Sequence, residues 1–434
     1  MDVTDPVVVP RAEHSISRSH IDPEALKVLY RLQQHDHRAY LVGGSVRDLL
    51  LGRQPKDFDI GTSAHPYEIK RLFRNCWIIG RRFRLAHVKF GTKTIEVATS
   101  RRKVPAGEEA APLADRPAAA GRTTITRSVH VVYHDNTFGT PEEDAFRRDF
   151  TLNALFYDIA TFALIDYTGG LADLRAGLIR CIGDPDERFV EDPVRMLRAV
   201  ALEARLDFRI DPPLLEAIER KRLEMSRSAP PRLIEEFYKI LRAGVSARTF
   251  RRLREAGVLE AVVPELQFRA SDAFWQSLTE LDAYRRRLPA PAIREPWSPG
   301  VERFTNPILL GSLLVPLGFQ PHLRQDSSIG LGMLPLARRD VDRLRQILQL
   351  QRRLVVDATA PARVRCGLAH RSAFPEALTW LEIHGNAPAA SESWRSFLLE
   401  SAAADRPHVE QGDAASPRRR RRRRRGRFRR PPVQ

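Results

Sequence analysis

Residues 41–62 read LVGGSVRDLLLGRQPKDFDIGT, which places a glycine turn close to an Asp-x-Asp pair. The apolar residues 39–42 predict a strand that ends at Gly43 and Gly44. The next apolar residues have the spacing of a helix, and the alternation over residues 57–61 predicts a second strand. Strand, glycine turn, helix and strand therefore follow one another in this short stretch.

The Asp-x-Asp pair predicts a cation site. Side chains at positions i and i+2 of a strand lie on one face, so Asp57 and Asp59 would stand side by side. Two neighbouring carboxylates repel each other unless a cation lies between them. Hard oxygen ligands that leave room for phosphate oxygens favour Mg²⁺, and a pair of such ions could activate an attacking hydroxyl and neutralise a leaving pyrophosphate. A lone Asp-x-Asp is more often a solvated turn, so this inference depends on the glycines beside it.

The glycine turn predicts a phosphate-binding backbone. Gly43 and Gly44 let the chain approach a ligand closely, and Ser45 opens a helix whose N–H groups attract a triphosphate. Arg47 adds a fixed cation. The alternative is an ordinary strand-to-helix turn. No G-x-x-x-x-G-K-[ST] segment occurs, so a P-loop ATPase is not supported.

The composition limits the class of protein. The 434 residues are enough for about two to four structural units. The chain has 71 basic and 54 acidic side chains and a net charge of +17, but 11 arginines and no acid lie in residues 418–430. The basicity is therefore mostly a property of this tail, and the remainder carries about +6.

Cysteine usage and hydropathy predict a cytoplasmic protein. Cys76, Cys181 and Cys366 lie far apart without a C-x-x-C pair, so neither a disulfide framework nor a thiolate zinc site is encoded. The first residues contain no apolar leader, and the most apolar stretch, residues 307–319, is too short to span a bilayer. We therefore expect a reducing compartment and no membrane partner.

Changes of pattern along the chain predict an α+β head followed by an all-helical remainder. Residues 103–123 are rich in Pro, Ala and Gly without a period and predict a mobile insertion. Helical spacing dominates from residue 192 onwards. The predicted units are a flexible lead-in (1–20), a head (21–180), a helical neck (181–260), a helical body (261–400) and a disordered arginine-rich tail (401–434).

Two later motifs add a family resemblance. RRDFTLNALFYD occupies residues 147–158 and EDPVRMLRAV occupies residues 191–200. With the glycine turn and the Asp-x-Asp pair, they make residues 25–257 resemble the polymerase-β-like nucleotidyltransferases of the bacterial poly(A) polymerase and CCA-adding enzyme family. The resemblance implies a nucleotidyltransferase head, a neck that binds the nucleotide base and RNA, a body that binds RNA, and RNA 3′ ends as partners. No protein partner can be inferred.

The resemblance also implies roles for individual carboxylates. Asp57 and Asp59 match the metal-binding pair, and Asp149 matches the further acidic position of the second motif. Glu96 competes with Asp149 for the role of third carboxylate. It lies in an apolar strand, where a charge needs a partner, so a structural ion pair is the alternative.

Nucleotide contacts are implied in the same way. Arg148 and Asn153 would contact the triphosphate and ribose. Asp192 and Arg195 would form a protein template for one base edge, because an acid beside a guanidinium supplies an acceptor and donors in a fixed plane. Arg198 would orient Arg195. For Asp192, Arg195 and Arg198, the alternative interpretation is the first turn of a helix with i, i+3 ion pairing.

One segment separates the branches of the family. Residues 74–90 contain G-R-R-F-x-L-x-H-V, which is similar to the poly(A) polymerase branch rather than to CCA-adding enzymes, although His87 is expected to pack rather than to catalyse. The implied activity is template-independent addition of AMP from ATP to RNA 3′ ends with Mg²⁺. CCA addition to tRNA is the alternative enzyme activity, and a catalytically idle RNA-binding protein is the alternative without chemistry. The region after about residue 259 matches the family poorly.

Overall fold

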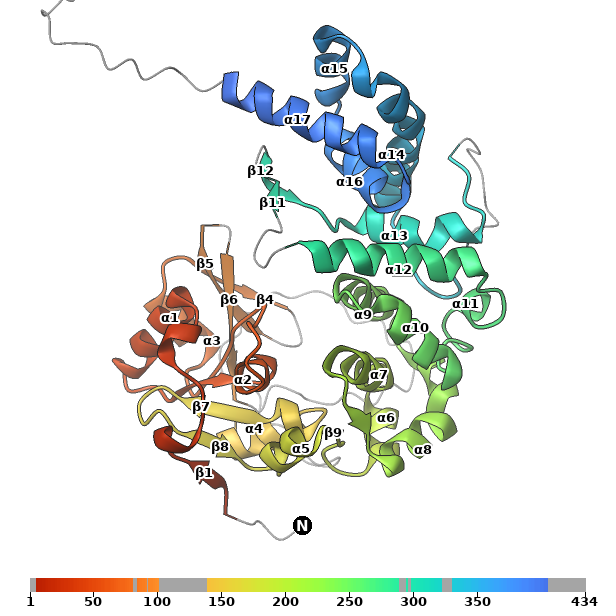
Figure 1. Ribbon diagram of the computed structural model, residues 1–434. Coiled ribbons are helices and arrows are strands. Elements are labelled where there is room, and N and C mark those ends of the chain that lie inside the picture. Colours follow the sequence, from red (N-terminus) through yellow and green to blue (C-terminus); the bar gives the residue numbers. More distant parts are fainter. Residues whose placement is uncertain are drawn as a thin grey trace, which may run out of the picture.

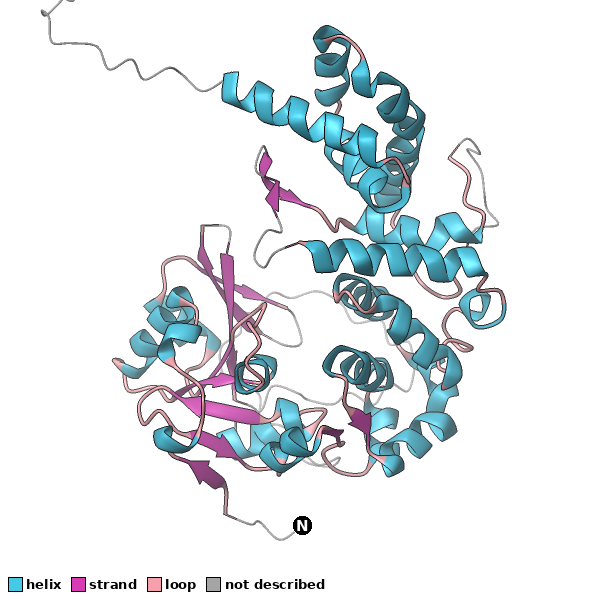
Figure 2. Ribbon diagram, in the orientation of Figure 1, coloured by secondary structure: helices cyan, strands magenta, loops and turns pink. Residues whose placement is uncertain are grey.

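The computed structural model describes residues 5–80, 84–91, 93–100, 139–288, 294–295, 298–321 and 330–404. The head lies on one side of the molecule, the neck helices face it, and the body helices continue beyond the neck (Figure 1). The mobile insertion predicted for residues 103–123 and the arginines of residues 418–430 lie outside the described residues. The predicted α+β class is confirmed, and the eight-stranded sheet belongs to the head (Figure 2).

In the described part of the head, eight strands form one sheet in the order β1-β8-β7-β2-β3-β6-β5-β4. The strands are β1 (Val7–Val9), β2 (Ala39–Val42), β3 (Asp59–Thr62), β4 (Cys76–Ile79), β5 (Leu85–Phe90), β6 (Lys93–Thr99), β7 (Leu155–Asp158) and β8 (Leu164–Asp166). Neighbouring strands are antiparallel except β3 and β6, which run parallel. This parallel pairing places Asp59 directly beside Glu96.

The two faces of the β3–β6–β5–β4 half of the sheet differ. Ile60, Val88 and Ile95 are fully buried on one face, where α1 (Pro23–Gln33) and α3 (Pro66–Leu72) join the hydrophobic core. Because side chains alternate along a strand, residues between them point to the opposite face. That face carries Asp59 and Glu96 and is largely open to solvent.

Two local predictions need correction. Residues 7–9, predicted as part of a loose lead-in, form the edge strand β1 and pair with β8, because the run of valines supplies a short strand that has no detectable period. The strand predicted to start at Asp57 starts at Asp59. Its partner β2 ends at Val42, opposite Asp59, so no ladder is available to Asp57.

Helices make up most of the rest of the described chain. In the head and neck they are α2 (Gly44–Leu50), α4 (Pro141–Arg147), α5 (Gly170–Ala176), α6 (Pro185–Glu191), α7 (Val194–Leu206), α8 (Pro212–Lys221), α9 (Pro230–Arg242) and α10 (Ser246–Glu255). In the body they are α11 (Pro264–Phe268), α12 (Asp272–Arg287), α13 (Asn306–Leu314), α14 (Arg338–Val356), α15 (Ala362–Ala369), α16 (Phe374–His384) and α17 (Pro388–Ala404). None of the helices in the described ranges has both the length and the apolar character to cross a bilayer.

Small strand pairs interrupt the helical part that the sequence predicts as all-α. β9 (Leu178–Ile179), at the end of the predicted head, pairs with β10 (Arg209–Ile210), and β11 (Arg294–Glu295) pairs with β12 (Ser298–Glu302) within the predicted body. β9, β10 and β11 have only two residues each, which gives too little alternation for a sequence pattern to reveal.

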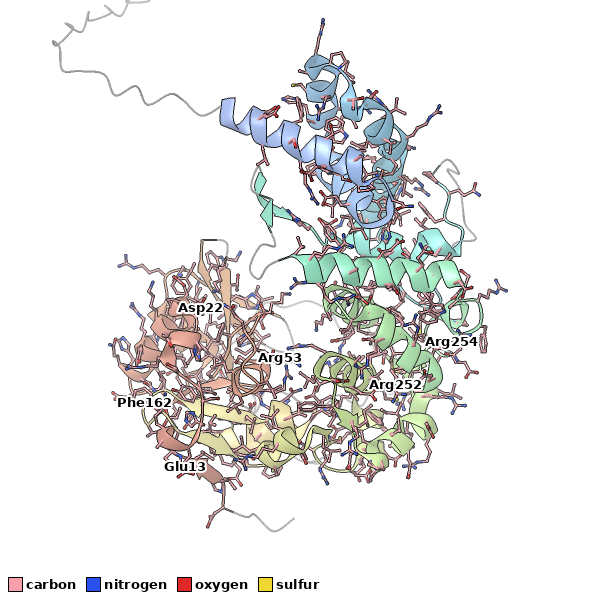
Figure 3. All side chains as sticks on the ribbon, in the orientation of Figure 1. Glu13, Asp22, Arg53, Phe162, Arg252 and Arg254 are labelled. Atoms are coloured by element: carbon pink, nitrogen blue, oxygen red, sulfur yellow. The ribbon has the colours of Figure 1, made fainter. Side chains whose placement is uncertain are left out.

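The head and neck are tied together near the end of α7. Arg53 of the head donates hydrogen bonds to the carbonyls of Arg205 (3.0 Å) and Leu206 (3.4 Å). Its position between head and neck is visible in Figure 3. Arg205 also forms an ion pair with Asp48 of α2. Groups far apart in the sequence therefore fix the relation between the two regions.

Candidate active site

A cavity of about 580 Å³ opens between the head and the neck. It brings together most of the predicted site residues: Gly43, Gly44, Arg47, Asp59, Arg148, Asp149, Asn153, Asp192, Arg195 and Arg198. Arg147, Arg205, Glu236 and Lys239 also line it and were not predicted. Asp57, Ser45 and Glu96 are not among the lining residues.

The glycine turn is required by the close approach of an arginine. Gly43 has φ +73° and ψ −136°, a conformation that favours glycine. A Cβ atom at this position would lie 2.9 Å from Nη1 of Arg148. Ser45 is buried, and its hydroxyl donates to the Val42 carbonyl (2.9 Å), so it holds the turn rather than facing the cavity.

Arg47 and Asp48 form a buried polar pair in α2. Nε and Nη2 of Arg47 donate to Oδ1 of Asp48 (2.9 and 2.7 Å), and Nη1 donates to Oδ1 of Asn153. Burial lowers the pKa of Arg47, although Asp48 opposes the shift. The second oxygen of Asp48 accepts from Arg205 of the neck. Asp48 thus connects the glycine-turn helix to α7, a role signalled in the sequence only by an acid within an apolar helix.

Asp59 is open to the cavity, yet the surrounding protein removes much of its solvation. This desolvation, together with the like charges of Glu96 and Asp57, raises the pKa of Asp59 to about 6 against the opposing effect of Arg148. Asp57 lies in the segment before β3, and its side chain is 72% exposed, 4.0 Å from Nζ of Lys56. The two carboxylates are therefore near each other, but, contrary to the prediction, they do not occupy positions i and i+2 of one strand.

Glu96 has the position of a third carboxylate. Glu96 lies on β6, where it is the register partner of Asp59 on β3 and of His87 on β5. Oε1 of Glu96 lies 3.5 Å from Nε2 of His87, so the structure also provides the close partner that the ion-pair alternative requires. Among the described residues, no group of three or more acidic, histidine or cysteine side chains is arranged to hold a metal ion by itself. A cation here would need additional oxygen ligands.

Asp149 is already engaged by donors on both oxygens. Its Oδ1 accepts from the Phe150 amide (2.8 Å) and from Nδ2 of Asn153 (2.9 Å), and its Oδ2 lies 3.6 Å from Nη1 of Arg198. Arg148 donates to the Asn153 carbonyl (3.2 Å) and to Oδ2 of Asp144 (2.9 Å). These contacts make Asp149 an organiser of the second motif.

The neck wall presents an acid and two arginines. Oδ2 of Asp192 accepts from Arg232 (2.9 Å), whereas Oδ1 is buried without a hydrogen-bond partner. Nη1 of Arg195 donates to the Arg188 carbonyl (2.8 Å) and to Oε2 of Glu191 (3.1 Å). The side chains of Asp192 and Arg195 therefore have separate partners, unlike the i, i+3 pair of the alternative interpretation.

Further buried arginine contacts support this wall and were missed from the sequence. Arg188 donates to the carbonyls of Arg147 (2.7 Å) and Arg148 (2.6 Å), which joins α6 to the second motif. Arg198 donates to Oε1 of Glu236 through Nε (3.3 Å) and Nη2 (3.2 Å). Such contacts join residues about 40 positions apart, so no local pattern reports them.

The sheet, the glycine turn and the carboxylate-bearing strand have the arrangement expected of the predicted nucleotidyltransferase head. Residues 39–180 match the family model "Poly A polymerase head domain", and residues 207–269 match "Probable RNA and SrmB-binding site of polymerase A". The chain accordingly matches the poly(A) polymerase and CCA-adding enzyme family, and the resemblance predicted from the motifs is confirmed.

Individual relatives come from both branches. Poly(A) polymerase I of Salmonella typhi is 48% identical over 260 residues, which are 60% of this chain and 54% of the relative. The CCA-adding enzyme of Lactobacillus johnsonii is 35% identical over 238 residues, 55% of this chain and 54% of the relative. The chain thus spans about half the length of the curated relatives it matches. A crystal structure of the Bacillus stearothermophilus CCA-adding enzyme in complex with CTP has 27% identity and a TM-score of 0.57, with 88% of this chain and 83% of that chain covered.

Proposed function

We propose that this protein is a template-independent poly(A) polymerase that adds AMP from ATP to RNA 3′ ends. The observation that carries the proposal is that one cavity joins Asp59 of the head to Asp192 and Arg195 of the neck. A carboxylate suited to phosphoryl chemistry and a polar pair suited to a base edge thus face the same space. The 48% identity to a poly(A) polymerase I, against 35% to a CCA-adding enzyme, favours AMP addition.

Base selection is assigned to the neck. Oδ1 of Asp192 is a buried acceptor without a partner, and an unpaired acceptor is costly unless a ligand satisfies it. The amino group of adenine is a suitable donor for it. The guanidinium of Arg195, held by Glu191 and the Arg188 carbonyl, supplies donors for an adjacent ring nitrogen. Arg198, fixed by Glu236, keeps this wall in place.

Cation binding is assigned to Asp59 and Glu96, with Asp57 beside them. Desolvation, together with repulsion by Glu96 and Asp57, raises the pKa of Asp59, and a divalent cation bound here would favour the ionised carboxylate. Mg²⁺ commonly uses one or two carboxylates and completes its shell with water and phosphate oxygens, so this donor set fits the ion. When bound, Mg²⁺ lowers the pKa of an attacking hydroxyl and neutralises charge on pyrophosphate.

The remaining residues orient the nucleotide. The backbone turn at Gly43 and Gly44, with Arg148 packed against it, is assigned to the triphosphate. Asn153, held by Arg47 and Asp149, is assigned to the ribose. In the reaction, the RNA 3′ oxygen bonds to the α-phosphorus, the bond to the bridging oxygen breaks, and pyrophosphate leaves.

CCA addition to tRNA remains the second candidate because the CTP complex of a CCA-adding enzyme covers 88% of this chain. A cytoplasmic location is part of the proposal, since the described cysteines Cys76, Cys181 and Cys366 are all free thiols. The proposal needs no protein partner and no membrane.

An incorporation assay tests the proposal. The full chain is incubated with Mg²⁺, a generic RNA or a tRNA lacking its 3′ end, and each nucleotide alone or in pairs. Long tails from ATP alone on generic RNA are expected. Addition of CTP and ATP only to the truncated tRNA would select the CCA-adding activity instead. If no nucleotide is incorporated into either RNA, the remaining interpretation is an RNA-binding protein without catalytic activity.

A further inference from the structure

A row of side chains crosses the open face of the head sheet from the candidate cation site to the outer edge. Asp59 is the register partner of Glu96, Glu96 of His87, and His87 of Trp77. Register partners point to the same side of a sheet. Trp77, on the edge strand β4, therefore shares its face with Asp59, and adjacent strands separate the two by three spacings, roughly 14 Å.

The end of this row is aromatic and basic. Trp77 is 49% exposed, and the ammonium groups of Lys70 and Lys89 lie 5.5 and 5.3 Å from the centre of its ring. Tyr67, one turn before Lys70, is 61% exposed, with the Arg84 guanidinium 5.6 Å from its ring centre. Tyr67 and Lys70 belong to α3, which packs on the buried face, so the basic and aromatic surface continues from Trp77 around the β4 edge, where Nζ of Lys70 also donates to the Cys76 carbonyl. No acidic side chain within the described ranges forms an ion pair with Lys70, Lys89 or Arg84. We call these five residues the Trp77 ledge.

We propose that the Trp77 ledge binds the single-stranded RNA a few nucleotides before its 3′ end, through base stacking and phosphate contacts. This inference rests on the proposed function, because it assigns a path to the RNA whose 3′ hydroxyl reacts at Asp59. It is separate from residues 207–269, where the family model places RNA binding.

The chemistry of the ledge fits a single strand. Exposed aromatic rings accept any base by stacking, and lysines beside them contact phosphates without selecting sequence. A stacked strand advances about 3.4 Å per nucleotide, so the distance from Asp59 to Trp77 corresponds to roughly four nucleotides.

Primer length provides the sharpest test. For a 15-nucleotide primer, Trp77→Ala should raise the KM for RNA about 5- to 150-fold, the effect of one lost stacked base, while kcat and the KM for ATP stay near wild type. For a three-nucleotide primer, which does not reach the ledge, the same variant should behave as wild type. Trp77→Phe should recover most of the affinity because it keeps a stacking face.

Two controls separate the ledge from general surface effects. Lys27→Ala removes an exposed lysine of α1, and Val356→Ala removes an exposed apolar side chain of α14, so both should leave the KM for RNA unchanged. An unchanged KM in Trp77→Ala with the long primer, or an equal change for both primers, would overturn the inference.

Direct binding of a labelled 15-nucleotide RNA without ATP keeps the inference independent of turnover. Weaker binding by Trp77→Ala, in a protein that incorporates no nucleotide, would support the ledge and reject the proposed function. Equal binding by wild type and variant, in a protein that does incorporate AMP, would reject the ledge alone. Added phospholipid vesicles or a peptide mixture should not compete with the RNA; if either displaces it from the wild type but not from Trp77→Ala, the occupant is not RNA.

Discussion

The head and the neck face the same cavity, but their charges are arranged in opposite ways. In the head, Asp59 stands beside Glu96 with Asp57 nearby, and desolvation together with this repulsion raises the pKa of Asp59 to about 6. In the neck, charges are matched within the protein, as Arg195 is by Glu191 and Arg198 by Glu236. The head side of the cavity, with Asp59, therefore favours an added cation. On the neck side, the charges of Arg195 and Arg198 are already balanced by the protein. In the proposed function, this difference corresponds to chemistry in the head and base selection in the neck.

Removing a head carboxylate should have the largest effect. Asp59→Ala should lower incorporation at least about a thousandfold, because several kcal/mol of charge stabilisation in the transition state are lost. Its stability should be unchanged or slightly raised, since a repelling charge is removed. The measurement is AMP incorporation together with thermal unfolding.

Glu216→Ala, which removes an exposed carboxylate of α8, is the matched control and should keep full activity. Substantial Mg²⁺-dependent incorporation by a folded Asp59→Ala protein would remove the head wall from the chemistry.

Removing a neck arginine should change selection rather than chemistry. Arg195→Ala should reduce the ratio of kcat/KM for ATP to that for CTP about 5- to 150-fold, the equivalent of about 1 to 3 kcal/mol for hydrogen bonds to a charged group. Dependence on Mg²⁺ should remain. Arg220→Ala, which removes an exposed arginine of α8 that pairs with Asp186 of α6, should not alter the ratio. If the ratio is the same in Arg195→Ala as in wild type, the base is selected elsewhere.

Loosening the contact between the two walls should have a smaller and unselective effect. Arg205→Ala removes the neck partner of Asp48, and imprecise placement of reacting groups slows a reaction. We expect kcat/KM to fall about tenfold for ATP and CTP alike. Arg248→Ala breaks an ion pair with Asp207 that lies entirely within the neck and serves as control. A selective loss with one nucleotide would show that Arg205 contacts the base.

The smallest effect concerns pH in the absence of metal. The ordinary pKa of the Asp59 carboxyl is 3.8, and in the folded protein it is about 6. Between these values the native state binds more protons than the unfolded state, so stability falls as pH rises from about 4 to 6. Asp59→Asn has no carboxyl to titrate and does not lose this stability. The Tm of the variant minus the Tm of wild type should therefore rise by up to about 3 °C as pH increases from about 4 to 6. The change is small because the side chain is open to the cavity.

Differential scanning calorimetry in a chelator measures this difference directly. Addition of Mg²⁺ at pH 7 should raise the Tm of wild type and have less effect on Asp59→Asn. A difference that is constant with pH would contradict the electrostatic account of the head wall.

Local patterns predict the parts of the site that are local in sequence. The glycine turn and Asp59 follow from a strand, a turn and a second strand that are almost contiguous. The start of β3 was misplaced because the end of its partner β2, not the alternation of its own residues, determines where the ladder begins. Asp57 therefore lies outside the strand.

Long-range pairings escaped prediction for a related reason. Glu96 could be named as a candidate, but its place beside Asp59 depends on the parallel pairing of β3 with β6. The ion pair between Asp48 and Arg205 joins residues 157 positions apart and crosses from head to neck. Neither periodicity nor spacing contains this information, because it is created by the packing of separate elements.

The separation of chemistry from selection is tested most directly by nucleotide binding to a protein that cannot react. Isothermal titration of Asp59→Ala with ATP and with CTP, in Mg²⁺, measures the preference of the neck wall alone. We predict that this variant binds ATP more tightly than CTP by the same ratio as wild type, although it incorporates neither, and that the additional change Arg195→Ala removes the preference. Loss of the preference in Asp59→Ala itself would contradict the account, since base selection would then depend on the head carboxylates.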